Sequence, residues 1–183
     1  MAVLPLVIAP DPRLKKVSEA VKPEELNDDL RKFMDDLLET MYDSNGLGLA
    51  AVQVGVQKRI LVMDIAQGSI RYDGTHHPDA EPDPLFLINP EIVWQSDNKF
   101  VFEEGCLSFP AQFAEVERPE KVRVKFFDYY GEEREMAFEK LAAVCVQHEI
   151  DHLNGIVFVE HISKMKREYI MRKLEKIKKK SVF

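Results

Sequence analysis

The sequence predicts an α+β fold in which antiparallel β-strands pack around a central helix carrying an HExxH pattern. Three observations predict it: an amphipathic segment near the N-terminus, several short segments rich in β-branched and aromatic residues, and two more segments with helical periodicity near the C-terminus. A chain of 183 residues is long enough for one hydrophobic core. We therefore expect a single domain over residues 1–183.

The first predicted element is an amphipathic helix over residues 24–44, where apolar side chains recur at spacings of three and four. It is expected to end at Asn45-Gly46, because both residues tolerate the left-handed conformation that ends helices. The next segment, 46–53, is predicted to be a loop. Strands follow, with a hairpin turn at 128–131, in segments 59–65, 85–94, 99–103, 121–128 and 132–138.

The polar segment 67–84 contains three prolines and has no periodicity, so it is predicted to be a surface loop in which His76 and His77 are solvated. A helix is expected at 139–154, with Gly155 just past its end. A final helix at 164–179 has apolar residues on one side and lysines elsewhere. It is either a solvated amphipathic helix or a surface for the phosphate backbone of RNA.

Composition and charge narrow the class of protein. The chain is 45% hydrophobic and 31% charged, which is typical of a globular rather than a disordered protein. Residues 164–180 hold nine Lys/Arg and two Glu, which gives this segment a charge of +7. Because the net charge of the whole chain is −7, the rest of the chain carries a charge of −14. The apolar start is short and interrupted by Pro5 and Pro10, and no segment resembles a secretory h-region behind a basic n-region, so we expect no secretory signal. We expect a cytoplasmic protein that contacts neither membrane nor DNA.

Within the 139–154 helix, His148, Glu149 and His152 match the HExxH pattern. Residues four apart on a helix share one face, so both imidazoles can reach one metal ion while Glu149 lies beside it. A metal acidifies a bound water, and a neighbouring carboxylate can take its proton and pass it to a leaving amine. The alternative is a surface helix with two chance histidines. Leu141 and Cys145 argue against it, because they make that face apolar.

Two histidines leave a catalytic metal one protein ligand short. In one large class of metalloprotease a third histidine follows at a fixed spacing, but that position is Phe158 here. Cys106 is the leading candidate, since it lies just after a predicted strand. Gly105 before it allows close approach of the backbone, and Pro110 after it fixes the direction in which the chain continues. The alternative for this cysteine is a buried core residue. A disulfide with Cys145 is disfavoured in a reducing compartment.

Three blocks of sequence, at 46–53, 104–108 and 147–155, resemble those of the peptide deformylases in order and separation, as do residues 10–14 and 88–91. The resemblance covers nearly the whole chain. It implies a hydrolase that removes the N-formyl group from the N-terminal formylmethionine of newly made polypeptides and releases formate. The expected partners are therefore N-formylmethionyl nascent peptides. The basic segment 164–183 resembles the tail with which bacterial members contact the ribosome.

The resemblance also implies roles for individual residues. One divalent metal ion would be held by Cys106, His148 and His152, usually Fe²⁺ in this family, with Zn²⁺, Ni²⁺ or Co²⁺ able to replace it. Glu149 would be the general base and acid. The remaining roles are oxyanion stabilisation by the Gln53 side chain and the Leu107 backbone N–H, a substrate groove at Gly46, Leu47 and Gly48, and a methionine pocket at Leu141, Val144 and Cys145.

Three alternatives of other classes stand beside this interpretation. An HExxH endopeptidase would use the same helix, but Phe158 and the block at 104–108 disfavour it. A catalytically inactive homologue that binds ribosomes or formylated peptides would be expected to lack a catalytic side chain. A structural metal site would normally have four protein ligands, and the sequence offers three candidates.

Overall fold

The computed structural model describes residues 2–66 and 81–180. Within these ranges, seven strands form two antiparallel sheets, accompanied by long helices and short 3₁₀ turns. The α-helices are α1 (Asp28–Asp43), α3 (Lys140–Leu153) and α4 (Lys164–Lys180). None of the helices in the described part of the chain is both long and apolar enough to cross a bilayer.

The larger sheet has five strands in the order β1-β2-β3-β6-β7, and each neighbouring pair is antiparallel. Its strands are β1 (Gly48–Ala50), β2 (Ile60–Met63), β3 (Leu85–Gln95), β6 (Lys121–Phe127) and β7 (Glu133–Glu139). The second sheet is a hairpin of two strands, β4 (Lys99–Cys106) and β5 (Phe109–Pro119). Both β1 and β4 lie at the edge of their sheets, so each has one side without a strand neighbour among the described residues.

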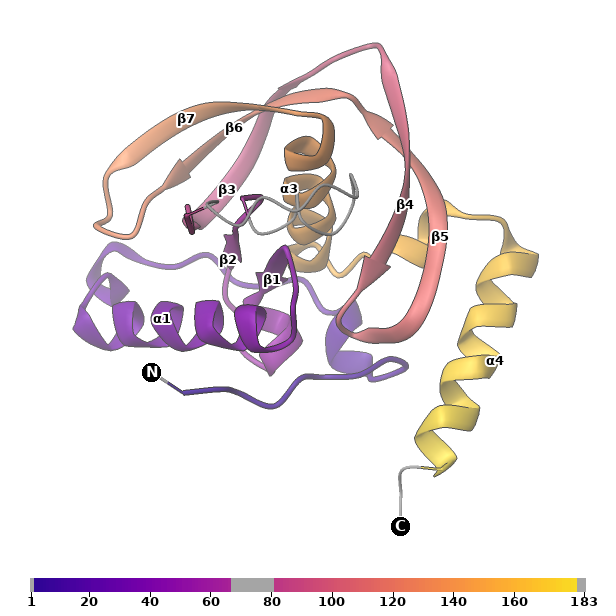
Figure 1. Ribbon diagram of the computed structural model, residues 1–183. Coiled ribbons are helices and arrows are strands. Elements are labelled where there is room, and N and C mark those ends of the chain that lie inside the picture. The colour runs from indigo at the N-terminus through magenta and orange to yellow at the C-terminus, as the bar shows by residue number, and fades with distance from the viewer. Residues whose placement is uncertain (1, 67–80, 181–183) are drawn as a thin grey trace.

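Helix α3 lies between the larger sheet and the β4–β5 hairpin (Figure 1). Ten of its fourteen residues are buried, so nearly its whole circumference is covered. Its apolar side chains pack with those of β2, β3 and β6 in one core cluster. Helix α1 covers a second cluster with Met34, Leu37 and Met41. Helix α4 lies outside β5, against which Ile170 and Leu174 pack.

The expectation of antiparallel sheets combined with helices is confirmed, with corrections to the boundaries. Helix α1 begins at Asp28 rather than at residue 24, because Asn27 caps it by accepting a hydrogen bond from the Leu30 N–H at 3.0 Å. It ends at Asp43, and Asn45 adopts the left-handed conformation with φ of 55°. Gly155, with φ of 72°, follows the end of α3 as expected.

Two strands were not predicted. Segment 46–53 contains β1 and most of the 3₁₀ turn Ala51–Val54, so the expectation of a loop there was wrong. Strand β5 was missed because prolines lie near both of its ends and because Arg118, a charged residue, points inward and breaks the apolar alternation. His76 and His77, and with them most of the predicted loop at 67–84, lie outside the described residues.

A buried ionic network joins the β4–β5 hairpin to α3. The Arg118 guanidinium on β5 donates two hydrogen bonds to Glu104 on β4, at 2.6 and 3.0 Å, and one to Asp151 on α3, at 2.8 Å. Burial by itself would raise the pKa of Glu104, but hydrogen bonds from His148 and Arg118 outweigh it and hold the pKa at about 2. Each charge is therefore paired at a depth where an unpaired charge would be strongly destabilising.

Replacing Arg118, the cation of this network, tests how much the network contributes to stability. We expect Arg118→Met to lower the free energy of unfolding by about 3–5 kcal/mol near pH 7, because Glu104 is left buried without its partner. The matched control is Arg123→Met, whose pair with Glu135 is exposed, and it should cost less than about 1 kcal/mol. Denaturant unfolding measures both.

The difference in unfolding free energy between the wild type and Arg118→Met depends on pH with a defined sign. In the wild type, the pKa of Glu104 falls from 4.5 to about 2 on folding, so its stabilisation is present above pH 4.5 and is lost as the pH falls towards 2. In Arg118→Met, burial favours the protonated carboxyl. The gap between the two proteins should therefore narrow below pH 4.5, and a gap that stays constant would contradict this account.

Candidate metal centre

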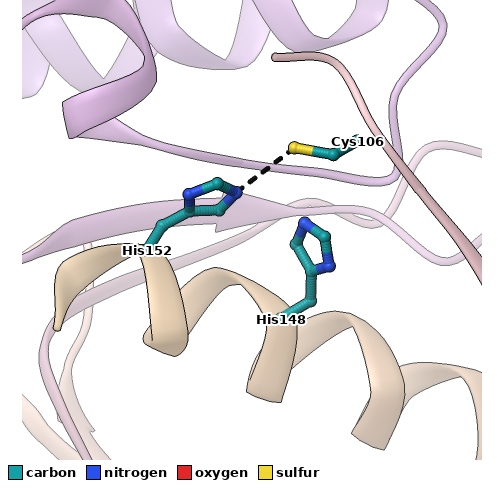
Figure 2. Close-up of side chains that lie close together, drawn as sticks. All are labelled: Cys106, His148 and His152. Carbon is teal, nitrogen blue, oxygen red and sulfur yellow. Dashed lines mark hydrogen bonds between the residues drawn. The ribbon is translucent and has the colours of Figure 1, made fainter. Parts of the chain in front are cut away.

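The three predicted metal ligands lie together. Cys106 is the last residue of β4, and His148 and His152 lie one turn apart on α3. One side-chain ligand atom from each residue lies within 4.8 Å of the others, and the Cys106 Sγ is 3.3 Å from the His152 Nε2. Figure 2 shows both imidazole rings projecting from α3 towards the thiol.

Neighbouring groups set the orientation and protonation of the two rings. The His148 Nδ1 lies 2.9 Å from the ionised Glu104 carboxylate and donates to it, so Nε2 is the nitrogen that can bind a metal. Burial by itself would lower the pKa of His148, but Cys106 and Glu104 outweigh it and raise the pKa well above its ordinary value, so metal binding at Nε2 releases a proton. Burial, reinforced by the nearby His148, lowers the pKa of His152 well below its ordinary value and keeps this ring neutral. A neutral imidazole is the form that binds a metal. One thiol and two buried imidazoles, held this close, fit a divalent transition-metal ion.

Glu149 lies beside the ligands with its carboxylate buried. Its Oε2 has no hydrogen-bond partner among the described residues, and its Oε1 lies 3.9 Å from the His148 Nε2. Burial is the main cause that raises the pKa of Glu149 to about 7, and the charge of Glu104 adds to it. A carboxylate with a pKa near neutrality can both accept and return a proton at physiological pH.

The Gln53 side chain lies next to Cys106. The backbone N–H of Ala50 donates to the Gln53 Oε1 at 2.9 Å, which fixes the orientation of the amide. The amide Nε2 then points towards the Cys106 Sγ at 3.5 Å and the Ser108 Oγ at 3.2 Å. This buried N–H donor is therefore pre-oriented towards the candidate metal centre.

A cavity of about 340 Å³ opens over these residues. Gly48 must be a glycine here, because a Cβ atom would lie 2.8 Å from both the Cys145 Sγ and the Glu149 Cγ. Burial raises the pKa of Cys145 well above its ordinary value, so this thiol is a neutral, apolar part of the wall. The residues that line the cavity include Gly46, Leu47, Gly48, Phe102, Gly105, Cys106, Leu107, Phe113, Cys145, His148 and Glu149.

Most of the predicted site residues meet at this cavity, and four do not line it. Gln53 and His152 contact Cys106 but are not part of the lining, and Leu141 and Val144 are also absent from it within the described part of the chain. The sequence assigned no role to Glu104, which hydrogen bonds to His148, or to Phe102 at the cavity. The signal for Glu104 was its place two residues before Cys106, on the same side of a strand.

Comparison with known proteins identifies relatives over the whole chain. Residues 3–168 match the family model for polypeptide deformylase. The peptide deformylase of Mesorhizobium japonicum is 49% identical over 179 residues, covering 98% of this chain and 95% of that protein. The peptide deformylase of Phenylobacterium zucineum is 46% identical over 176 residues, covering 96% of this chain and 97% of that protein.

Solved structures agree with this result. The crystal structure of peptide deformylase from Ehrlichia chaffeensis superposes with a TM-score of 0.88 at 42% identity, covering 100% of both chains. The peptide deformylase from Legionella pneumophila gives a TM-score of 0.85 at 40% identity, over 97% of this chain and 96% of that one. Together with the family model, these relatives show that the chain belongs to the polypeptide deformylase family.

Proposed function

We propose that this protein removes the N-formyl group from the N-terminal formylmethionine of newly synthesised polypeptides and releases formate. The reaction is hydrolysis of a formamide: water adds to the formyl carbon, the carbon–nitrogen bond breaks, and the free amine leaves with one proton. The observation that carries the proposal is the cluster of Cys106, His148 and His152, whose ligand atoms lie within 4.8 Å of one another beside Glu149 in a cavity.

Cys106, His148 and His152 are proposed to hold one divalent metal ion. The ion would supply Lewis acidity, polarising the formyl oxygen and lowering the pKa of water. The proposed working ion is Fe²⁺, as the family resemblance implies, and a donor set of one thiolate and two imidazoles also accepts Zn²⁺, Ni²⁺ or Co²⁺. The charge of the thiolate makes the centre less positive than one with three imidazoles.

Glu149 is proposed to carry the proton. Its Oε2 takes a proton from the attacking water and returns it to the leaving nitrogen, and a pKa of about 7 suits both transfers. This atom has no hydrogen-bond partner among the described residues, so no bond has to break before it accepts the proton. The side-chain amide of Gln53 and the backbone N–H of Leu107 are the proposed donors to the developing oxyanion.

The substrate is proposed to bind as an extended strand between the edges of β1 and β4. Both edges border the cavity, through Gly48 on one side and Gly105 on the other. Gly46, Leu47 and Gly48 then form one wall, where the lack of side chains at the glycines lets a peptide backbone approach closely. We propose Leu141, Val144 and Cys145 for the methionine pocket. Of these three, Cys145 lines the cavity directly.

A crystal structure of the Ehrlichia chaffeensis peptide deformylase in complex with actinonin superposes on this chain with a TM-score of 0.86 at 43% identity, over 100% of both chains. The similarity supports an accessible ligand site in this fold. The inactive-homologue alternative is disfavoured, because Glu149 and all three candidate ligands are in place.

The ribosome is the proposed second partner, in the cytoplasm, through α4. Ile170 and Leu174 are buried, while the lysines of the last turn are exposed. A basic face of this kind suits the phosphate backbone of RNA.

We expect the triple change Lys176→Glu/Lys179→Glu/Lys180→Glu to weaken association with ribosomes at low salt by at least tenfold in ribosome pelleting. Association that does not change would reject this partner.

The role of Glu149 is tested by Glu149→Gln. We expect the metal to remain bound and kcat for formate release from a formyl-Met-Ala peptide to fall by about 10²–10⁴, because the proton carrier and not a ligand is removed. The assay uses anaerobically prepared, iron-loaded protein. The matched control is Glu139→Gln, an exposed carboxylate at the start of the same helix, which should retain activity. Full activity of Glu149→Gln would contradict the assigned role.

The contact between Glu104 and His148 is tested by metal affinity. We expect Glu104→Gln to weaken metal binding about 10–100-fold, because a neutral amide supports the imidazole less well than a carboxylate does. Competition with a chelator, using Zn²⁺ or Ni²⁺, measures the affinity without any assay of activity. Asp151→Asn is the control, since Asp151 contacts Arg118 and His161 but not His148. Equal losses in both variants would point to general destabilisation instead.

A further inference from the structure

Phe113, on β5, is a large apolar side chain that is exposed at the edge of the cavity. Its exposed fraction is 59%, yet it borders the cavity. The ring lies directly over Gly105, where a Cβ atom would be 2.6 Å from the Phe113 Cε1. Gly105 directly precedes Cys106, a candidate metal ligand. An aromatic ring with free surface therefore lies at the mouth of the cavity, within one residue of the proposed metal centre.

A second aromatic side chain continues this apolar rim. Phe102, on β4, also lines the cavity. Its ring is stacked with that of Phe100, with centroids 6.2 Å apart and planes 21° from parallel. Phe100, Phe102 and Glu104 are alternate residues of one strand and so project to the same face. Phe102 and Phe113 thus both border the cavity, Phe102 from the Glu104 face of the hairpin and Phe113 from the opposite face, and Phe100 stacks on Phe102. These two rings form the rim.

The surface next to this rim is acidic. Glu103 on β4 is directly opposite Glu115 on β5, in the pair of positions next to Gly105 and Phe113. Glu117 follows on the same outer face, and all three carboxylates are exposed. Directly opposed like charges disfavour further negative charge at this face. A side chain lying on Phe113 would therefore meet an aromatic surface bordered by carboxylates.

The position of the rim identifies the part of the substrate that it would touch. The formyl carbon must lie at Glu149 and the metal ligands, so methionine occupies the interior of the cavity. An extended peptide advances about 3.3 Å per residue, and successive side chains point to opposite sides. The residue directly after methionine therefore reaches the mouth, where Phe102 and Phe113 lie.

We propose that Phe113, together with Phe102, makes this enzyme selective for the residue that follows formylmethionine, favouring aromatic and other apolar side chains and disfavouring acidic ones. The inference rests on the proposed function and adds a specificity determinant to it. The contact is remote from the reacting bond and is made equally before and during the reaction. It is therefore expected to act mainly on KM rather than on kcat.

The test compares three peptides, formyl-Met-Phe-Ser, formyl-Met-Ala-Ser and formyl-Met-Glu-Ser, by kcat and KM for formate release from metal-loaded protein. For the wild type we expect kcat/KM to fall in the order Phe, Ala, Glu. In Phe113→Ala, the ratio of kcat/KM for the Phe peptide over the Ala peptide should fall about fivefold, the scale of one aromatic contact. Phe113→Lys should raise kcat/KM for the Glu peptide relative to the Phe peptide.

Two further variants serve as controls. Phe113→Tyr keeps the ring and should keep the preference. Val101→Ala changes an equally exposed apolar residue, 54% exposed, on the outer face of the same hairpin but away from the cavity lining, and should leave all ratios as in the wild type. A Phe-to-Ala ratio within twofold of the wild type in Phe113→Ala, with formate still released, overturns the inference. No formate release from any peptide by metal-loaded wild type overturns the proposed function instead.

Discussion

The carboxylate of Glu104 is the contact on which both the fold and the candidate site depend. It accepts two hydrogen bonds from Arg118 and one from His148, and Arg118 continues the network to Asp151 on α3. The hairpin is thereby attached to α3 beside the two histidines. Cys106 lies two residues beyond Glu104 on the same strand, so this attachment also brings the thiol to 3.3 Å from His152. Burying these charges costs desolvation free energy, and the network that results positions the candidate metal ligands.

Two buried glutamates, Glu104 and Glu149, have pKa values shifted in opposite directions. Glu104 and Glu149 are both buried, but the pKa of Glu104 is held at about 2 and that of Glu149 is raised to about 7. The difference lies in their partners. Glu104 has Arg118 and His148 as donors, whereas the Glu149 Oε2 has no partner among the described residues. A permanently ionised carboxylate suits orientation of a ligand, and one that titrates near neutrality suits proton transfer.

Local patterns in the sequence were enough for part of this structure. The spacing of His148 and His152 and the apolar periodicity predicted α3. Runs of β-branched and aromatic residues predicted β2, β3 and β6, with alternation in β6, because these signals repeat within a few residues. The roles of Glu104 and Arg118 arise only when β4, β5 and α3 pack together. The same inward-pointing Arg118 concealed β5, since local propensity does not register a charge that is satisfied by distant partners. Cys106 became a ligand candidate only through its neighbours in sequence and the family resemblance.

The alternation of the hairpin strands places Phe113 on the face opposite Glu104, whereas Phe102, the other ring of the proposed rim, lies on the Glu104 face. Glu104, Val116 and Arg118 point inward, where they hold the ligands and pack the core, whereas Phe113, Glu115 and Glu117 point outward. Because successive residues of a strand face opposite sides, an outward residue can change without moving an inward one. Gly105 joins the two roles, since its missing side chain lets the Phe113 ring lie against the strand next to Cys106. Phe113, as part of the proposed rim, can therefore vary while the geometry of the candidate metal centre is retained.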